Sequence, residues 1–97
     1  MQIVVTPDGV ELRRPDNFRE FEALVSGDQL QLPDVLEPDG EQHLWVQEEW
    51  LRSALTQANL AAGWQQKYQA MLDYARSKGW VREQPLSVRA HIVRTET

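Results

Sequence analysis

The sequence feature that most constrains the fold is a helical segment, from about Leu60 to Lys78, that ends at a glycine. Apolar residues recur in it at i, i+4, i+7, i+8 and i+11, which would give a helix of this length one apolar face. Gly79 supplies the left-handed residue that often follows a helix. The apolar Trp80 would then fold back on Tyr74 or Ala75 in a Schellman-type stop. The apolar positions are Trp64, Tyr68, Met71, Leu72 and Ala75.

A shorter helix is predicted just upstream, at residues 47–57. Glu48 and Glu49 would occupy its first turn, where acidic side chains suit the positive end of the helix dipole. Asn59 would cap the long helix that follows, or both helices would continue as one through residues 61–63. The apolar stripe of the shorter helix consists of Trp50, Leu51, Ala54, Leu55 and Ala58.

The N-terminal residues 3–13 predict a β-hairpin. Two β-prone runs flank Pro7, Asp8 and Gly9, and these three residues have separate roles in a turn. Proline presets φ, aspartate bonds to the local backbone, and glycine accepts a positive φ.

A helix is also predicted at residues 17–26. Asn17 and Glu20 fit a capping box, in which each side chain satisfies a free backbone amide of the first turn. Apolar residues follow at helical spacing, and Gly27 would end the helix. These apolar residues are Phe18, Phe21, Leu24 and Val25.

The remaining strands are predicted from alternation. Residues 86–92 alternate apolar side chains with Ser87, Arg89 and His91, which is typical of a half-buried strand with a basic outer face. Short strands near 29–32 and 43–46 flank a turn-rich acidic loop. The fold class is therefore α+β: a small, mainly antiparallel sheet, formed by an N-terminal hairpin, middle strands and a C-terminal strand, covered on one face by two to three helices.

Length and composition place limits on the protein. Ninety-seven residues make a single domain, residues 1–97, and the absence of cysteine excludes disulfides and thiolate chemistry. The first residues lack the basic and apolar regions of a signal peptide, and no apolar run reaches the ~20 residues of a membrane span. We expect a soluble, cytoplasmic protein that does not bind membranes.

Charge is distributed unevenly along the chain. The segment 28–49 contains seven acidic residues and no lysine or arginine, while the second half is basic. The segment would face solvent or the basic C-terminal half, or it would bind a basic partner protein or a second copy. A net charge of −5 argues against binding to nucleic acid. The acidic residues proposed to bind the partner are Asp34, Glu37, Asp39 and Glu41.

Two residues of the last predicted strand are the best candidates for catalysis. If its polar face lines a cleft, His91 could act as a general base and Arg89 could hold an anionic group. The alternative is a solvated strand face. His43 is interpreted as a loop or edge residue. No metal site is predicted, because Glu48 and Glu49 point about 100° apart and only one could join His43.

Aromatic side chains are the other candidates for binding. Four tryptophans in a short chain would dominate a core or an interface, and buried core is the more common use. The alternative is a pocket or a dimer face, and a homodimer is favoured over a monomer. No nucleotide-binding or nucleophile motif is present, so no cofactor is predicted. The proposed pocket residues are Trp50, Trp64, Tyr68 and Trp80.

The residues alone leave three functions open, and they do not decide whether the chain is an enzyme. The first is a small acidic protein-interaction module, such as an adaptor, inhibitor or regulatory protein. The second is a cofactor-independent isomerase, lyase or hydrolase with His91 as base and Arg89 as anion anchor. The third is a non-catalytic small-molecule-binding domain with an aromatic-lined pocket.

Overall fold

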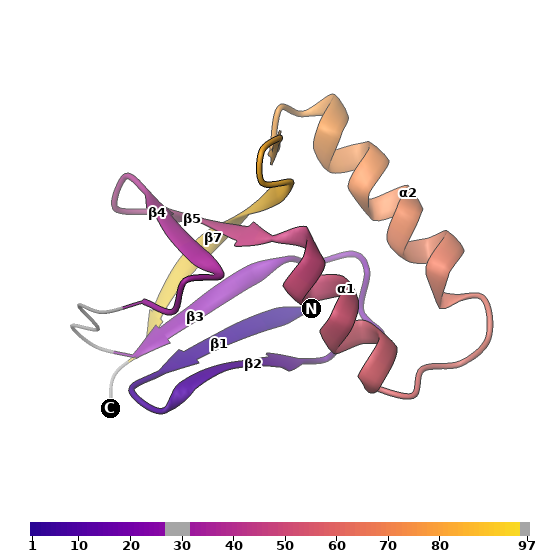
Figure 1. Cartoon of the computed structure of the whole chain (residues 1–97), viewed down its shortest axis with the longest axis horizontal. Coiled ribbons are helices and arrows are strands. Elements are labelled where there is room, and N and C mark those ends of the chain that lie inside the picture. Colours follow the sequence, from indigo (N-terminus) through magenta and orange to yellow (C-terminus); the bar gives the residue numbers. More distant parts are fainter. Residues whose placement is uncertain (27–31, 96–97) are drawn as a thin grey trace.

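The computed structural model describes residues 1–26 and 32–95, and over these residues the chain has a small α+β fold with one sheet and two helices (Figure 1). The strands are β1 Gln2–Thr6, β2 Gly9–Arg13, β3 Glu22–Ser26, β4 Leu36–Asp39, β5 His43–Gln47, β6 Val81–Arg82 and β7 Ser87–Thr95; the helices are α1 Glu48–Gln57 and α2 Trp64–Ser77.

The sheet is curled and mixed, with the strand order β2-β1-β3-β7-β5-β4. The β1–β2, β4–β5 and β5–β7 pairs are antiparallel, whereas β3 pairs in parallel with both β1 and β7. The short β6 pairs antiparallel with the start of β7. The predicted α+β class, the N-terminal hairpin, the strand near 43–46 and the C-terminal strand are thus present. The sheet was predicted to be mainly antiparallel, and it is mixed, with parallel pairs on both sides of β3.

Both helices contribute to one apolar core against the sheet. Leu51 and Leu55 of α1 are fully buried, and Tyr68, Leu72 and Ala75 of α2 are almost so. Burial of such side chains is the main favourable term in folding, at roughly 25 cal/mol per Å² of apolar surface. In the described residues, neither helix is both long and apolar enough to cross a membrane. The sheet residues of this core are Ile3, Val5, Ala23, Val25, Leu36, Leu44, Val46, Val88 and Ala90.

The predicted end of the long helix is confirmed. Gly79 has a φ of 78°, its amide donates to the carbonyl of Arg76, and the amide of Trp80 donates to the carbonyl of Ala75 at 2.9 Å. These two bonds define a Schellman motif. The ring of Trp80 lies 6.0 Å from that of Tyr74, so the residue after the glycine does fold back on the last turn.

The helix predicted at residues 17–26 is wrong, because residues 22–26 form the strand β3. The side chain of Asn17 accepts the amide hydrogen of Arg19, only two residues ahead, and so closes a local turn instead of capping a helix. Strand β3 then bonds to β1 on one side and β7 on the other. Burial of alternate residues, Ala23 and Val25, between two strands overrides the local helical spacing.

The start of the long helix also differs from the prediction. Helix α2 begins at Trp64 after a left-handed Gly63, and Asn59, with a φ of 58°, follows the end of α1 instead of capping α2. Neither the asparagine cap nor one continuous helix is found.

The acidic loop contains the strand β4, which was not predicted from the sequence. The strand predicted near 29–32 lies almost wholly outside the described residues, as does the helix exit at Gly27.

Candidate functional site

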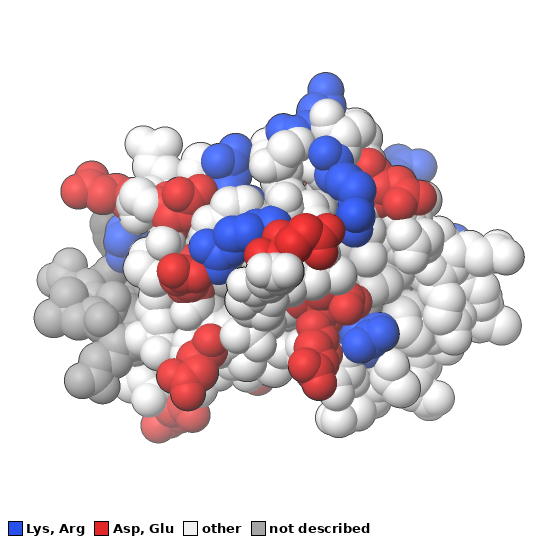
Figure 2. All heavy atoms as spheres, turned by 45° about the horizontal axis from the view of Figure 1, so that its top comes forward, with Lys and Arg blue, Asp and Glu red and all other residues white. Residues whose placement is uncertain are grey.

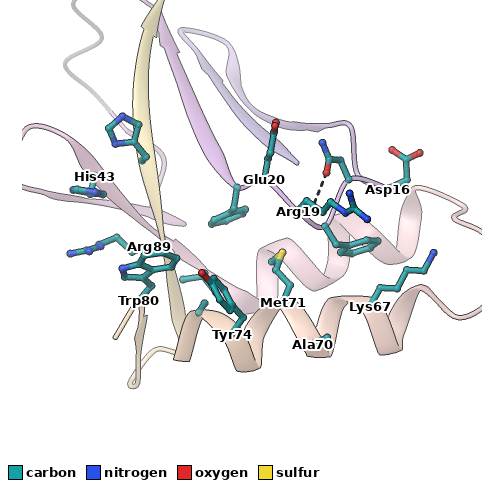
Figure 3. A pocket seen from close by; sticks show the side chains of 16 residues that line it. Asp16, Arg19, Glu20, His43, Lys67, Ala70, Met71, Tyr74, Trp80 and Arg89 are labelled. Atoms are coloured by element: carbon teal, nitrogen blue, oxygen red, sulfur yellow. Dashed lines mark hydrogen bonds between the residues drawn. The ribbon is translucent and has the colours of Figure 1, made fainter. Parts of the chain in front are cut away.

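A groove of about 690 Å³ lies beside helix α2. One wall is a face of α2, and the opposite wall is the loop of residues 16–21 that leads into β3 (Figure 3). One end of the groove is bordered by Trp80 and by residues of β5 and β7. This volume lies in the range of small-molecule sites, roughly 300–1,000 Å³.

The α2 wall is a helix face distinct from the buried one. Lys67, Ala70, Met71 and Tyr74 line the groove at i, i+3, i+4 and i+7, so they lie on one side of the helix. The neighbouring face carries Tyr68, Leu72 and Ala75 into the core, and Ala75 also borders the groove. Tyr74 is 57% exposed and is the large hydrophobic residue left exposed in the described chain. The helix therefore presents the exposed ring of Tyr74 and the half-buried Met71 to the groove.

The loop wall is held by the first residue of the chain. The amino group of Met1 donates to the carbonyls of Asn17 and Glu20, both at 2.8 Å, and the amide of Glu22 donates to the carbonyl of Met1. Burial lowers the pKa of this amino group, although Glu20 and Glu22 act in the opposite direction. Phe18 is thereby held half-buried against the groove, as is Phe21 of the same loop.

Both predicted catalytic residues lie at the β7 end of the groove. Arg89 and His91 line it, and so does His43, which is the register partner of His91 on β5. The two imidazole rings are 5.5 Å apart in an edge-on arrangement. Sequence reasoning treated His43 and His91 separately; only the β5–β7 register brings them together. Whether His91 acts as a base stays a prediction.

Arg89 is already engaged within the protein. Its guanidinium faces the carboxylate of Asp39 at 3.5 Å, and in Figure 3 its side chain extends away from Trp80 and the α2 wall. An anion held by Arg89 would compete with Asp39. Because Arg89 is already paired with Asp39, the structure gives only weak support to its predicted role as an anion anchor.

Two acidic residues of the segment 28–49 form ion pairs with arginines of β6 and β7. Glu37 forms an ion pair with Arg82, which also lies over the ring of Trp45, and Asp39 pairs with Arg89. Acidic and basic side chains are interleaved on the face shown in Figure 2. This agrees with the interpretation that the segment faces the basic half of the chain. Asp34 and Glu41 are exposed, and partner binding stays a prediction.

Of the four aromatic residues proposed to line a pocket, only Trp80 borders the groove. Trp50 packs half-buried against the core from α1, and the ring of Trp64 lies 6.3 Å from that of Tyr68. Tyr68 is buried and donates its hydroxyl hydrogen to the Glu48 carboxylate at 2.9 Å. Burial, and then this hydrogen bond, raise the pKa of Tyr68 well above its usual value of 10.0. These residues are core components.

The groove residues missed from the sequence come from two places. Phe18 and Phe21 were assigned to the apolar positions of a helix, and Arg19 and Lys67 were not proposed as site residues. Two phenylalanines in a short polar stretch are the pattern that could have indicated the loop wall, because such large apolar side chains are usually buried against another part of the protein. Met71 was assigned to the core stripe. It packs half-buried against the core, and its side chain also points into the groove (Figure 3).

The described residues do not form a cluster of metal ligands at this site. Within residues 1–26 and 32–95, no three histidine, aspartate or glutamate side chains cluster as metal ligands would. Comparison with known protein families, curated proteins and solved structures gives no match to this chain.

Proposed function

We propose that the chain is a small-molecule-binding domain whose ligand occupies the groove between α2 and the 16–21 loop. The observation that carries this proposal is a groove of about 690 Å³ lined by the exposed Tyr74 and by the half-buried Met71, Phe18 and Phe21. Contiguous exposed apolar surface is costly in water, and in folded proteins it often marks a ligand or partner site. A ligand there would bury surface that the fold itself leaves open.

The proposal is tested by filling the groove from the helix. Ala70 lines it and is exposed, so Ala70→Phe should obstruct ligand without disturbing the core. Gln66→Phe, on an exposed α2 position that does not line the groove, is the matched control. A panel of small anionic, neutral and cationic aromatic compounds is screened by thermal shift and tryptophan emission. In a domain of this size, each 1 kcal/mol of ligand stabilisation raises Tm by about 4–8 °C.

The expected result is saturable stabilisation of the wild type and Gln66→Phe by at least one compound, and its loss in Ala70→Phe. No response across the panel would contradict the proposal. An equal response in all three proteins would place the binding site elsewhere.

A cofactor-independent enzyme is the second candidate, and the juxtaposition of His43 and His91 at 5.5 Å favours it. One imidazole could then accept a proton while its neighbour donates one. The test is turnover of a groove ligand, once identified, by His91→Ala and His43→Ala. Undiminished turnover by His91→Ala would exclude its role as base.

The acidic protein-interaction module remains a third proposal, supported by the exposure of Asp34 and Glu41. Reversal of Asp34, Glu37, Asp39 and Glu41 to lysine should abolish binding of a basic partner. Since Glu37 and Asp39 pair with arginines, the double variant Asp34→Lys/Glu41→Lys is the cleaner test. Retained partner binding by this folded double variant would contradict the proposal.

A further inference from the structure

The end of the groove that lies away from Trp80 carries two cations. Arg19 of the loop and Lys67 of α2 both line the groove, both are exposed, and both are drawn at this end in Figure 3. The carboxylates of Asp16 and Glu20 also border the groove, yet none of the ion pairs found among the described residues joins them to either cation. Arg19 and Lys67 are therefore available to a ligand.

The opposite end of the groove, near Trp80, is less suited to binding an anion. Arg89 is the arginine there, and Asp39 already faces it at 3.5 Å. A negatively charged ligand group at that end would have to displace a carboxylate of the same charge. At the other end, Asp16 and Glu20 border the groove but form no ion pair with Arg19 or Lys67 among the described residues, so an anion there would not have to break one.

Between the two ends the walls are apolar and largely aromatic. Phe18 and Phe21 lie on the loop side, with Met71 and Tyr74 on the helix side and Trp80 at the far end. The Tyr74 and Trp80 rings meet edge to face, with an interplanar angle of 72°. Aromatic walls with a thioether between them favour a flat, polarisable ring over a branched aliphatic chain.

From this arrangement we propose that the ligand is an aromatic monocarboxylate, whose ring lies between Met71 and Phe21 and whose carboxylate contacts Arg19 and Lys67. This inference rests on the proposed ligand-binding function and names its ligand class. Two cations and two carboxylates border this end, so its net formal charge is balanced before ligand enters. A single negative charge that approaches the cations is therefore favoured over a doubly charged group.

The experiment compares three probes with the same ring. They are 2-naphthoate, the neutral 2-naphthylmethanol and the cationic 2-naphthylmethylammonium, each titrated by calorimetry into the wild-type protein. The carboxylate should bind about tenfold more tightly than the neutral probe at low ionic strength, and the difference should shrink in roughly 0.5 M salt. The ammonium probe should bind more weakly than both.

Two double variants of equal charge change locate the interaction. Arg19→Gln/Lys67→Gln should lower the affinity for the carboxylate much more than the affinity for the neutral probe, and so remove the preference between them. Arg13→Gln/Arg76→Gln is the control, because both arginines are exposed, pair with Glu11 and Glu83, and lie outside the groove. It should keep the preference.

Two outcomes would overturn the ligand class. Equal affinity of the wild type for the carboxylate and the neutral probe would show that the groove takes apolar rings without regard to charge, and the proposed binding function would stand. If both double variants lost the preference for the carboxylate equally, the preference would arise from the net charge of the protein and not from Arg19 and Lys67. Absence of binding by all three probes, together with silence of the broader panel, would instead remove the binding function on which the inference rests.

Discussion

At the scale of single residues, the Glu48–Tyr68 pair links the two helices. Glu48 begins α1 and is 7% exposed, and its carboxylate accepts the Tyr68 hydroxyl hydrogen while Arg52 lies 3.8 Å away. Acidic residues at a helix start are usually explained by the dipole alone. Here one of the two, Glu48, also satisfies a buried phenol, and Glu49 remains exposed. The pair fixes the position of α2 and thereby one wall of the groove.

Removal of this hydroxyl should destabilise the fold. Tyr68→Phe leaves a nearly buried carboxylate without its closest donor, which typically costs about 1–3 kcal/mol. The free energy of unfolding is measured by urea denaturation. Tyr74→Phe, at an exposed tyrosine, is the matched control and should change it by less than about 0.5 kcal/mol. Equal effects of the two substitutions would contradict the structural role of the pair.

The same phenol makes stability depend on pH in the alkaline range. The pKa of Tyr68 is raised in the folded protein above its ordinary value of 10.0, so the folded state holds the phenolic proton more tightly. This contribution is fully present below the pKa of the unfolded chain and is lost as pH rises above it. The stability advantage of wild type over Tyr68→Phe should therefore shrink between about pH 9 and pH 11.5. A constant difference across that range would contradict this origin.

At the scale of elements, the end of α2 sets where Trp80 lies. Gly79 has a φ of 78°, a conformation that costs an L-residue with a Cβ roughly 1–2 kcal/mol. Gly79→Ala should lower the free energy of unfolding by about that amount, and Gly79→Asn by less, because asparagine enters this conformation more readily. Chemical denaturation of the three proteins checks the order. An alanine variant as stable as the wild type would contradict it.

The elements also show which parts of the fold local sequence can predict. The hairpin turn at Pro7–Gly9 and the stop at Gly79 depend on backbone preferences of a few adjacent residues, and both were predicted. Residues 22–26 were not, because their strand conformation depends on pairing with β1 and with β7, about 70 residues later in the chain. Phe18 and Phe21 fit a helical spacing, so no local feature distinguished the two outcomes.

At the scale of the whole molecule, the candidate site could be predicted only in part. Arg89, His91 and Trp80 were named from the sequence and do border the groove. Trp50, Trp64 and Tyr68 were named with them but belong to the core side of the helices. Which aromatic residues face an opening depends on the angle between α2 and the sheet, and helical periodicity cannot supply that angle. The pairing of His43 with His91 likewise requires the β5–β7 register.

The central claim is that the groove beside α2 is the binding site, and residue-resolved NMR tests it most directly. Backbone amide shifts of ¹⁵N-labelled protein are followed during titration with 2-naphthoate. The largest changes should fall on residues 16–21, on Lys67 to Ala75 and on Trp80, with saturation at one ligand per chain. Changes centred on β2 or on the exposed side of α1, with the groove residues unaffected, would contradict the claim.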